Sequence, residues 1–190
     1  MTTKAKIISL LGAVDRKGMG ALIATMEGSD FFTAPASTKY HLAYEGGLAD
    51  HSLNVHDVLS QKNLYLDLGL AEDTVRITSL LHDLCKMDTY VIAKAWRKDA
   101  NNKWEQYDRY EYREKFPVGH GEKSVMLLQQ YIRLTPEELV MIRWHMGGYE
   151  PRENYGAISN AWGLYKAAVA LHTADLEATY FVEHESRTDG

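Results

Sequence analysis

Histidine is the residue type with the greatest chemical potential in this chain of 190 residues. The sequence holds eight histidines but one cysteine, Cys85, so no disulfide can form within the chain and cysteine-rich zinc sites are excluded. A bound metal would therefore be held by imidazole nitrogens and carboxylate oxygens. These ligands suit Mn²⁺, Fe²⁺, Co²⁺, Ni²⁺ or Zn²⁺ better than the all-oxygen sites of Mg²⁺ and Ca²⁺ do.

The first candidate ligand is His51, which lies on a predicted helix over residues 47–61. Helix geometry puts His51 on the apolar face with Leu48 and Val55, whereas His56 lies about 140° further round, on the polar face. A buried histidine needs a partner, but a hydrogen bond within the core satisfies His51 as well as a metal does. Three histidines carry no such pattern and are predicted to be ordinary polar residues, namely His41, His56 and His184.

The second candidate is the dipeptide His82-Asp83. A His-Asp pair is weak evidence by itself, because the chain has another at His56-Asp57. The pair at 82–83 differs in that it ends a strongly apolar helical segment, where adjacent side chains can converge on one ion. An unpaired carboxylate would be costly to bury at that position.

Three more residues lie on or beside predicted helices. Asp175 shares a helix face with apolar neighbours, which indicates burial beside a cation, either an arginine, a lysine or a metal. His120 opens a helix after Pro117, and His145 follows one turn after Met141. Each of these positions alone also fits an ordinary polar side chain.

The elements that must position these residues are mostly helices. Apolar spacings of three and four predict helices over 5–14, 18–27, 47–61, 71–84, 136–146 and 157–183, with a loop over 31–46. Residues 90–112 differ, because alternating aromatic side chains flank the turn-like segment 99–103, which is typical of a β-hairpin. Such a hairpin is compatible with a lid or an arm that packs on a neighbour. It is equally compatible with a contact to substrate. We expect residues 1–190 to form one mainly α-helical domain.

Composition narrows the class of protein. The chain is 45% hydrophobic and 25% charged, which excludes a disordered or fibrous protein. Its net charge of −5 disfavours a broad basic surface for DNA or anionic membranes, so stable DNA binding is not expected. No segment approaches the roughly 18 apolar residues of a membrane span. The sequence therefore predicts a cytoplasmic protein without membrane association.

Five short motifs occur in an order typical of one enzyme superfamily. The chain reads GGLADH at 46–51, LLHDLCK at 80–86, GHGE at 119–122, WHM at 144–146 and LHTAD at 171–175. Together they resemble the HD superfamily of metal-dependent phosphohydrolases, over roughly residues 28–183. The nearest branch is that of small phage or bacterial HD hydrolases and the HD domain of 3′–5′ exoribonucleases. Cys85 stands where a small residue is common in that family. The resemblance implies an HD-type helical bundle, here with a β-hairpin insertion.

The resemblance also implies roles for individual residues. The implied metal ligands, for one or two divalent transition metal ions, are His51, His82, Asp83, His120, His145 and Asp175, with Asp83 bridging. Asp83 and Lys86 are the implied catalytic residues, although Lys86 also fits a lysine that interacts with the end of its helix. Candidate substrate contacts, each of which an ordinary surface role explains as well, are Lys39, Glu122, Lys123 and Arg152. His172 is expected to support the site from behind the ligands.

The predicted function is hydrolysis of a phosphoester or phosphoanhydride bond by a metal-activated water molecule. The expected substrate is a small phosphorylated molecule of nucleotide type. One alternative is a 3′–5′ exonuclease on short single strands, with the aromatic hairpin as a platform for bases. Another is a metal-bound sensor or interaction protein without catalytic activity. A homo-oligomer is compatible with the hairpin, but the sequence does not decide its state.

Overall fold

Helices make up most of the structure, a computed structural model that describes residues 1–183. The helices are α1 (Thr3–Gly12), α2 (Met19–Gly28), α3 (Gly47–Tyr65), α4 (Glu72–Leu81), α5 (His120–Leu128), α6 (Pro136–Arg143), α7 (Tyr155–Leu164) and α8 (Lys166–Glu177). The prediction of a mainly α-helical chain is confirmed. His184 lies outside the described residues. No helix among residues 1–183 has both the length and the apolar character needed to cross a membrane.

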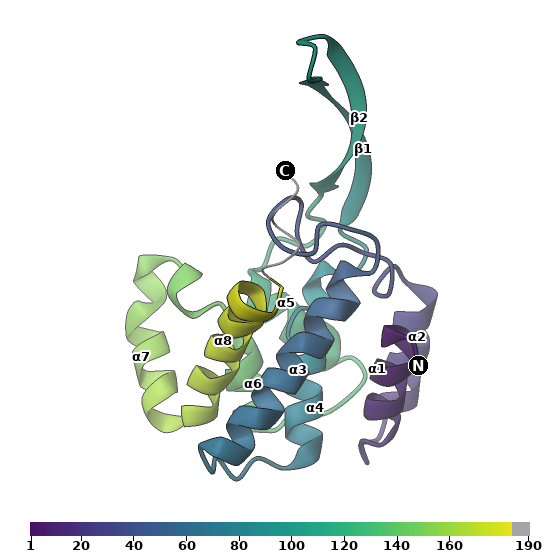
Figure 1. Cartoon of the computed structure of the whole chain (residues 1–190). Helices are drawn as coiled ribbons and strands as arrows, with labels where there is room; N and C mark the ends of the chain where they lie inside the picture. The colour runs from purple at the N-terminus through teal and green to yellow at the C-terminus, as the bar shows by residue number, and fades with distance from the viewer. Residues whose placement is uncertain (184–190) are drawn as a thin grey trace.

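The hairpin that interrupts the helices is also confirmed. Strands β1 (Tyr90–Lys98) and β2 (Trp104–Tyr112) pair antiparallel, with Tyr90 opposite Tyr112 and Lys98 opposite Trp104. Figure 1 shows this hairpin rising from one end of the helical body, with the helices packed below it.

Helices α3, α4, α6 and α8 form the centre of the body, with α3 against α4 and α8 and with α6 against α8. Their apolar residues divide into two clusters. Leu48, Leu80 and Ile142 belong to the cluster beneath α1 and α2. Val55 and Met141, from two of the same helices, belong to the cluster around α8. Helices α3, α4 and α6 thus face both clusters. The polar side chains of the site come from α3, α5 and α8 and from the segments that follow α4 and α6.

Three predicted helices are shorter than expected. The segment 136–146 is helical only as far as Arg143. The segment 71–84 is helical only as far as Leu81, after which His82 and Asp83 lead into a 3₁₀ turn at Leu84–Lys86. The segment 157–183 is divided at Tyr165, whose backbone is extended (φ −127°, ψ 89°), so that α7 turns back onto α8. Gly163, a poor helix former, precedes this break. After α8 the chain forms a π-helix over Ala178–Val182.

A buried carboxylate fastens α6 to the rest of the body. Glu138 is completely buried and accepts two hydrogen bonds from Arg16, at 2.7 and 3.0 Å, and one from Thr74 at 3.0 Å. It also closes a capping box with Thr135 at the start of α6. Burial raises the pKa of Glu138, but Arg16 and the Thr135 backbone outweigh it and hold the pKa below its ordinary value.

We expect Glu138→Ala to lower the free energy of unfolding by about 3 kcal/mol, because it leaves Arg16 without its carboxylate. A depressed pKa means that this contribution is present above pH 4.5 and is lost as pH falls through the folded-state pKa. Urea unfolding of wild type and variant across that range measures both effects. Glu137→Ala, one residue away in the same helical turn, is the control and should cost less than about 1 kcal/mol. An equal decrease in the free energy of unfolding in the two variants would contradict the prediction.

Candidate metal centre

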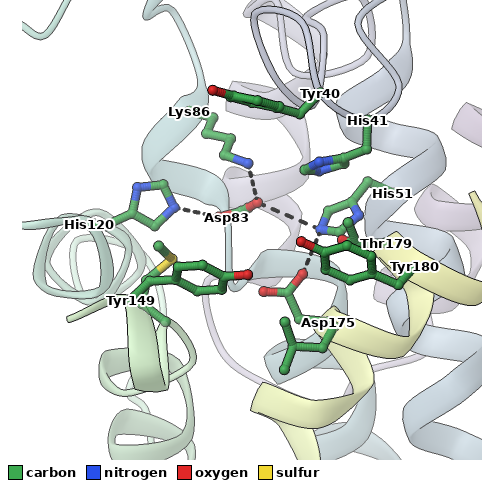
Figure 2. A pocket seen from close by; sticks show the side chains of 12 residues that line it. Tyr40, His41, His51, Asp83, Lys86, His120, Tyr149, Asp175, Thr179 and Tyr180 are labelled. Atoms are coloured by element: carbon green, nitrogen blue, oxygen red, sulfur yellow. Dashed lines mark hydrogen bonds and ion pairs between the residues drawn. The ribbon is translucent and has the colours of Figure 1, made fainter. Parts of the chain in front are cut away.

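The site is assembled from the ends of helices and from one turn of α3. His51 lies in the second turn of α3, and Asp175 lies on α8. His82 and Asp83 follow α4 directly, His120 is the first residue of α5, and His145 follows α6 by two residues. The structure thus brings together all six residues that the sequence singled out as metal ligands. Figure 2 shows three of them, His51, His120 and Asp175, around Asp83 at the floor of a pocket.

Asp83 lies at the centre of this cluster, and its two carboxylate oxygens face different histidines. Oδ1 lies 2.6 Å from His120 Nε2 and 3.5 Å from His145 Nε2. Oδ2 lies 3.5 Å from His82 Nε2 and 3.8 Å from His51 Nε2. One carboxylate therefore stands between two pairs of imidazole nitrogens, which is the arrangement of a bridging ligand.

Charge around Asp83 keeps it ionised. Burial alone would raise the pKa of this carboxyl, but the Lys86 ammonium and the imidazoles outweigh burial and hold the pKa well below its ordinary value. Lys86 Nζ lies 2.7 Å from Asp83 Oδ2 and also donates to the Ala36 carbonyl at 2.8 Å. The centre thus offers an anionic carboxylate in a buried setting.

Backbone carbonyls orient two of the imidazoles. His82 Nδ1 donates to Ser79 O at 2.7 Å, and His145 Nδ1 donates to Ile142 O at the same distance. Because the proton of neutral His82 is on Nδ1, the lone pair on its Nε2 points toward Asp83. Both Nε2 atoms are buried and have no hydrogen-bond partner.

This geometry fits a cation. Burial lowers the pKa of His82 to about 4, so that imidazole is neutral at neutral pH and puts no proton between itself and the carboxylate. Burial would lower the pKa of His145, but Asp83 and Asp175 outweigh burial and raise it. The lone pair that faces a carboxylate oxygen without a hydrogen bond is therefore that of His82, and an electropositive ligand would satisfy it. A divalent metal ion with imidazole and carboxylate ligands supplies what the buried atoms lack.

His51 is held by a carboxylate on each side. Its Nδ1 donates to Glu183 Oε1 at 3.0 Å, and its Nε2 lies 3.2 Å from Asp175 Oδ1. Burial alone would lower the pKa of His51, but Asp175 and Glu183 outweigh burial and raise it to about 10. Asn54 Nδ2 donates to the same Glu183 oxygen at 3.0 Å. Metal-binding histidines are commonly oriented by a carboxylate in this way.

The ligand atoms form two overlapping groups. Those of His51, His82 and Asp175 lie within 4.8 Å of one another, as do those of His82, Asp83 and His145. A third group of the same span contains Cys85 with Asp83 and His120. Burial raises the pKa of the Cys85 thiol to about 12, so it is protonated and unsuited as a thiolate ligand. The nitrogen and oxygen groups could hold one or two metal ions.

His172 supports the cluster from behind His145. Its Nδ1 donates to the His145 carbonyl at 2.6 Å, and its ring stacks on Trp162 with centroids 5.5 Å apart. Gly147 makes room for this ring, because a Cβ there would lie 2.5 Å from the imidazole. The side chain thereby fixes the backbone on which His145 stands.

A cavity of about 470 Å³ opens above the cluster. Aromatic side chains line its mouth and the ligand cluster forms its floor, as Figure 2 shows for Tyr40, Tyr149 and Tyr180. Lys86 and His41 also line it. Burial would lower the pKa of Lys86, but Asp83 outweighs burial and raises it, so the ammonium stays charged.

The four candidate substrate contacts do not line this cavity. Lys39 lies over the Tyr40 ring at 5.3 Å. Glu122 forms an ion pair with Arg143, and the buried Lys123 contacts Glu114 at 2.7 Å. The remaining candidate, Arg152, is exposed on a 3₁₀ turn.

Two residues that sequence reasoning missed lie at the site. His41 was expected to be an ordinary polar residue, but its ring lies 4.9 Å from that of His51 and lines the cavity. Glu183 was not considered. The position of His41 in the loop just before α3 was a usable signal, whereas Glu183 is 132 residues from its partner His51.

No family model, curated protein or solved structure in the comparisons matches this chain.

We expect the chain to bind divalent transition metal and Asp83→Asn to abolish most of that binding, because the amide removes the central charge. Metal content after dialysis against Mn²⁺ or Zn²⁺, measured by elemental analysis, tests this. Asp57→Asn is the matched control, since Asp57 is the carboxylate of the exposed His56-Asp57 pair and lies 3.1 Å from His56 Nδ1. Unchanged metal content in Asp83→Asn would show that the cluster is not the site.

We expect Glu183→Gln to weaken metal affinity by about 10- to 100-fold, because His51 loses the carboxylate that orients it. Isothermal titration with Mn²⁺ gives the dissociation constant. Asp50→Asn is the control. Asp50 lies on α3, the helix of His51, but its carboxylate accepts hydrogen bonds from Thr3 and Tyr44. The same metal affinity in Glu183→Gln and wild type would show that this carboxylate does not contribute to metal binding.

Proposed function

We propose that this chain is a metal-dependent phosphohydrolase of the HD type, which cleaves a phosphoester or phosphoanhydride bond of a small nucleotide-like molecule. The observation that supports this most directly is the position of Asp83 between two pairs of imidazole Nε2 atoms. The histidines and Asp175 that lie together are the residues that the resemblance implies as ligands. Two divalent ions, with Asp83 between them, match this set of ligands better than one.

Each ligand has a defined part in the proposed reaction. His51, His82 and Asp175 would hold one ion, and His120 and His145 the other. When bound, such ions supply Lewis acidity toward phosphoryl oxygens and activate a water molecule for attack. The protein contributes alignment, because carbonyls and Glu183 fix three of the imidazoles before substrate arrives.

Lys86 is the cation that this chain itself offers to a phosphate group. Its Nζ lines the cavity beside Asp83 and is held by the Ala36 carbonyl. A charged ammonium at this place binds a phosphoryl oxygen as a point charge and stabilises the charge that develops there. The net charge of −5 does not oppose an anionic substrate, because Lys86 and bound cations would make the pocket locally positive.

The rim of the cavity supports a substrate that carries a flat ring. Tyr40 and Tyr149 are 67% and 63% exposed, although both line the pocket, so each leaves an aromatic face open. Aromatic faces stack on nucleobases irrespective of the base. The cavity volume is within the range of about 300–1,000 Å³ that is usual for small-molecule sites.

A substrate screen tests this function. Metal-loaded protein, with Mn²⁺, Co²⁺ or Ni²⁺, is assayed for phosphate release from deoxynucleoside triphosphates, nucleoside monophosphates and cyclic nucleotides. Labelled single-stranded oligonucleotides form a separate arm, in which shortening would favour the exonuclease. A chain that binds metal but turns over none of these substrates would favour a sensor without catalytic activity.

We expect Lys86→Met to lower kcat by about 100-fold or more, because one charge that faces the developing phosphoryl charge is lost. Metal content should stay at the wild-type level, since Lys86 is not a ligand. Lys62→Met is the control, because Lys62 contacts Thr173 and Glu177 away from the cavity. Wild-type kcat in Lys86→Met would exclude Lys86 from catalysis.

A further inference from the structure

The β1–β2 hairpin stands clear of the helices, as Figure 1 shows. Its root is fastened to the body, since the Tyr90 hydroxyl donates to the Ala36 carbonyl at 3.3 Å and Arg113 N donates to Thr89 O at 2.7 Å. Beyond the root, two strands with no third layer form a sheet that is marginally stable by itself in water. A hairpin of this length therefore gains stability from a partner surface.

One face of the hairpin, here called the arm face, collects all but one of its aromatic side chains, the exception being Tyr107. Side chains alternate along each strand, so the register puts these residues on one face, namely Tyr90, Ile92, Lys94, Trp96, Lys98, Trp104, Gln106, Asp108, Tyr110 and Tyr112. Ile92, Trp96 and Trp104 are 69%, 61% and 65% exposed. Large apolar side chains this open, gathered on one surface, indicate an interaction site.

The charges of the arm face disfavour nucleic acid as its partner. Lys94 is paired with Asp108 at 2.5 Å, and Lys98 lies over the Trp104 ring at 5.6 Å. A single-stranded nucleic acid needs unpaired cations along its phosphates as well as aromatic platforms. The arm face offers the platforms, but its cations are already engaged, which favours a protein surface.

We propose that the arm face is the interface of a symmetrical dimer, with the arm face of a second copy as its occupant. Two such faces are close to self-complementary, because each exposes Ile92, Trp96 and Trp104 and carries a net charge of only +1 from Lys94, Lys98 and Asp108. Stacked about 10 Å apart, the hairpins form two layers and each supplies the packing that the other lacks.

The area agrees with a dimer. The exposed surface of Trp96, Trp104 and Ile92, together with that of Tyr90 and Tyr112 at the root of the hairpin, amounts to roughly 500 Å² for each copy. Two copies then bury about 1,000 Å², the lower limit for a specific interface. The dimer should accordingly dissociate on dilution.

Sedimentation equilibrium of the full chain across micromolar concentrations tests the proposal. We expect a dimer that dissociates on dilution, and a monomer mass throughout for Trp96→Asp and for Trp104→Asp. Tyr107→Asp is the matched control, since Tyr107 lies on the opposite face of the same hairpin and contacts Arg97. This control should remain dimeric. Acrylamide quenching of tryptophan fluorescence in wild type should increase on dilution, as the two arm tryptophans become accessible.

Four outcomes would overturn the proposal. A wild-type chain that is monomeric at every concentration has no such interface. A dimer that survives in both tryptophan variants uses another surface. A monomer that binds a labelled oligothymidine, and loses this binding in both tryptophan variants, uses the arm face for single-stranded nucleic acid instead. Loss of the dimer in the Tyr107→Asp control as well would assign association to hairpin folding rather than to the arm face, and would also overturn it.

Discussion

A neutral imidazole that faces a buried carboxylate sets the central constraint on this protein. Asp83 is almost completely buried, and the Nε2 atom of His82 faces it without a proton to share. Lys86 compensates part of the negative charge, but it contacts only one of the two oxygens. Burial of a carboxylate is tolerated when its charge is matched on all sides. The His82 lone pair leaves that matching incomplete in the protein alone, so a bound cation would also stabilise the folded chain.

The same hydrogen bonds that end two helices also prepare their histidines. The last carbonyls of a helix lack intrahelical partners, and Ser79 and Ile142 lie in the last turns of α4 and α6. In both cases the imidazole three residues later donates to that carbonyl. One bond thus satisfies a helix end, fixes the tautomer and aims Nε2 at the centre. The two histidines that follow α4 and α6 are held in this way, whereas His51, His120 and Asp175 lie within helices.

The sequence supported those parts of the structure that depend on local pattern. Apolar spacing predicted the helices, and the alternation around residues 99–103 predicted the hairpin, because both signals arise from side-chain period. The resemblance carried by the five motifs predicted that the six candidate ligands lie together. Glu183 could not be found this way, since its contact with His51 depends on how the chain returns after α8. The break at Tyr165 was missed because apolar spacing continues across it, and only packing of α7 on α8 decides it.

The β1–β2 hairpin and the candidate metal centre share one hydrogen-bond acceptor. Lys86 Nζ and the Tyr90 hydroxyl both donate to the Ala36 carbonyl, so the root of the hairpin and the cation beside Asp83 are held by the same loop. That loop continues into Tyr40 and His41, which line the cavity. The loop is closed on itself by hydrogen bonds from Ala36 N to Leu42 O at 3.1 Å and from Ser37 Oγ to His41 O at 2.8 Å. A partner that immobilised the hairpin would therefore also steady the wall of the pocket, and the Ala36 carbonyl would couple assembly to the site.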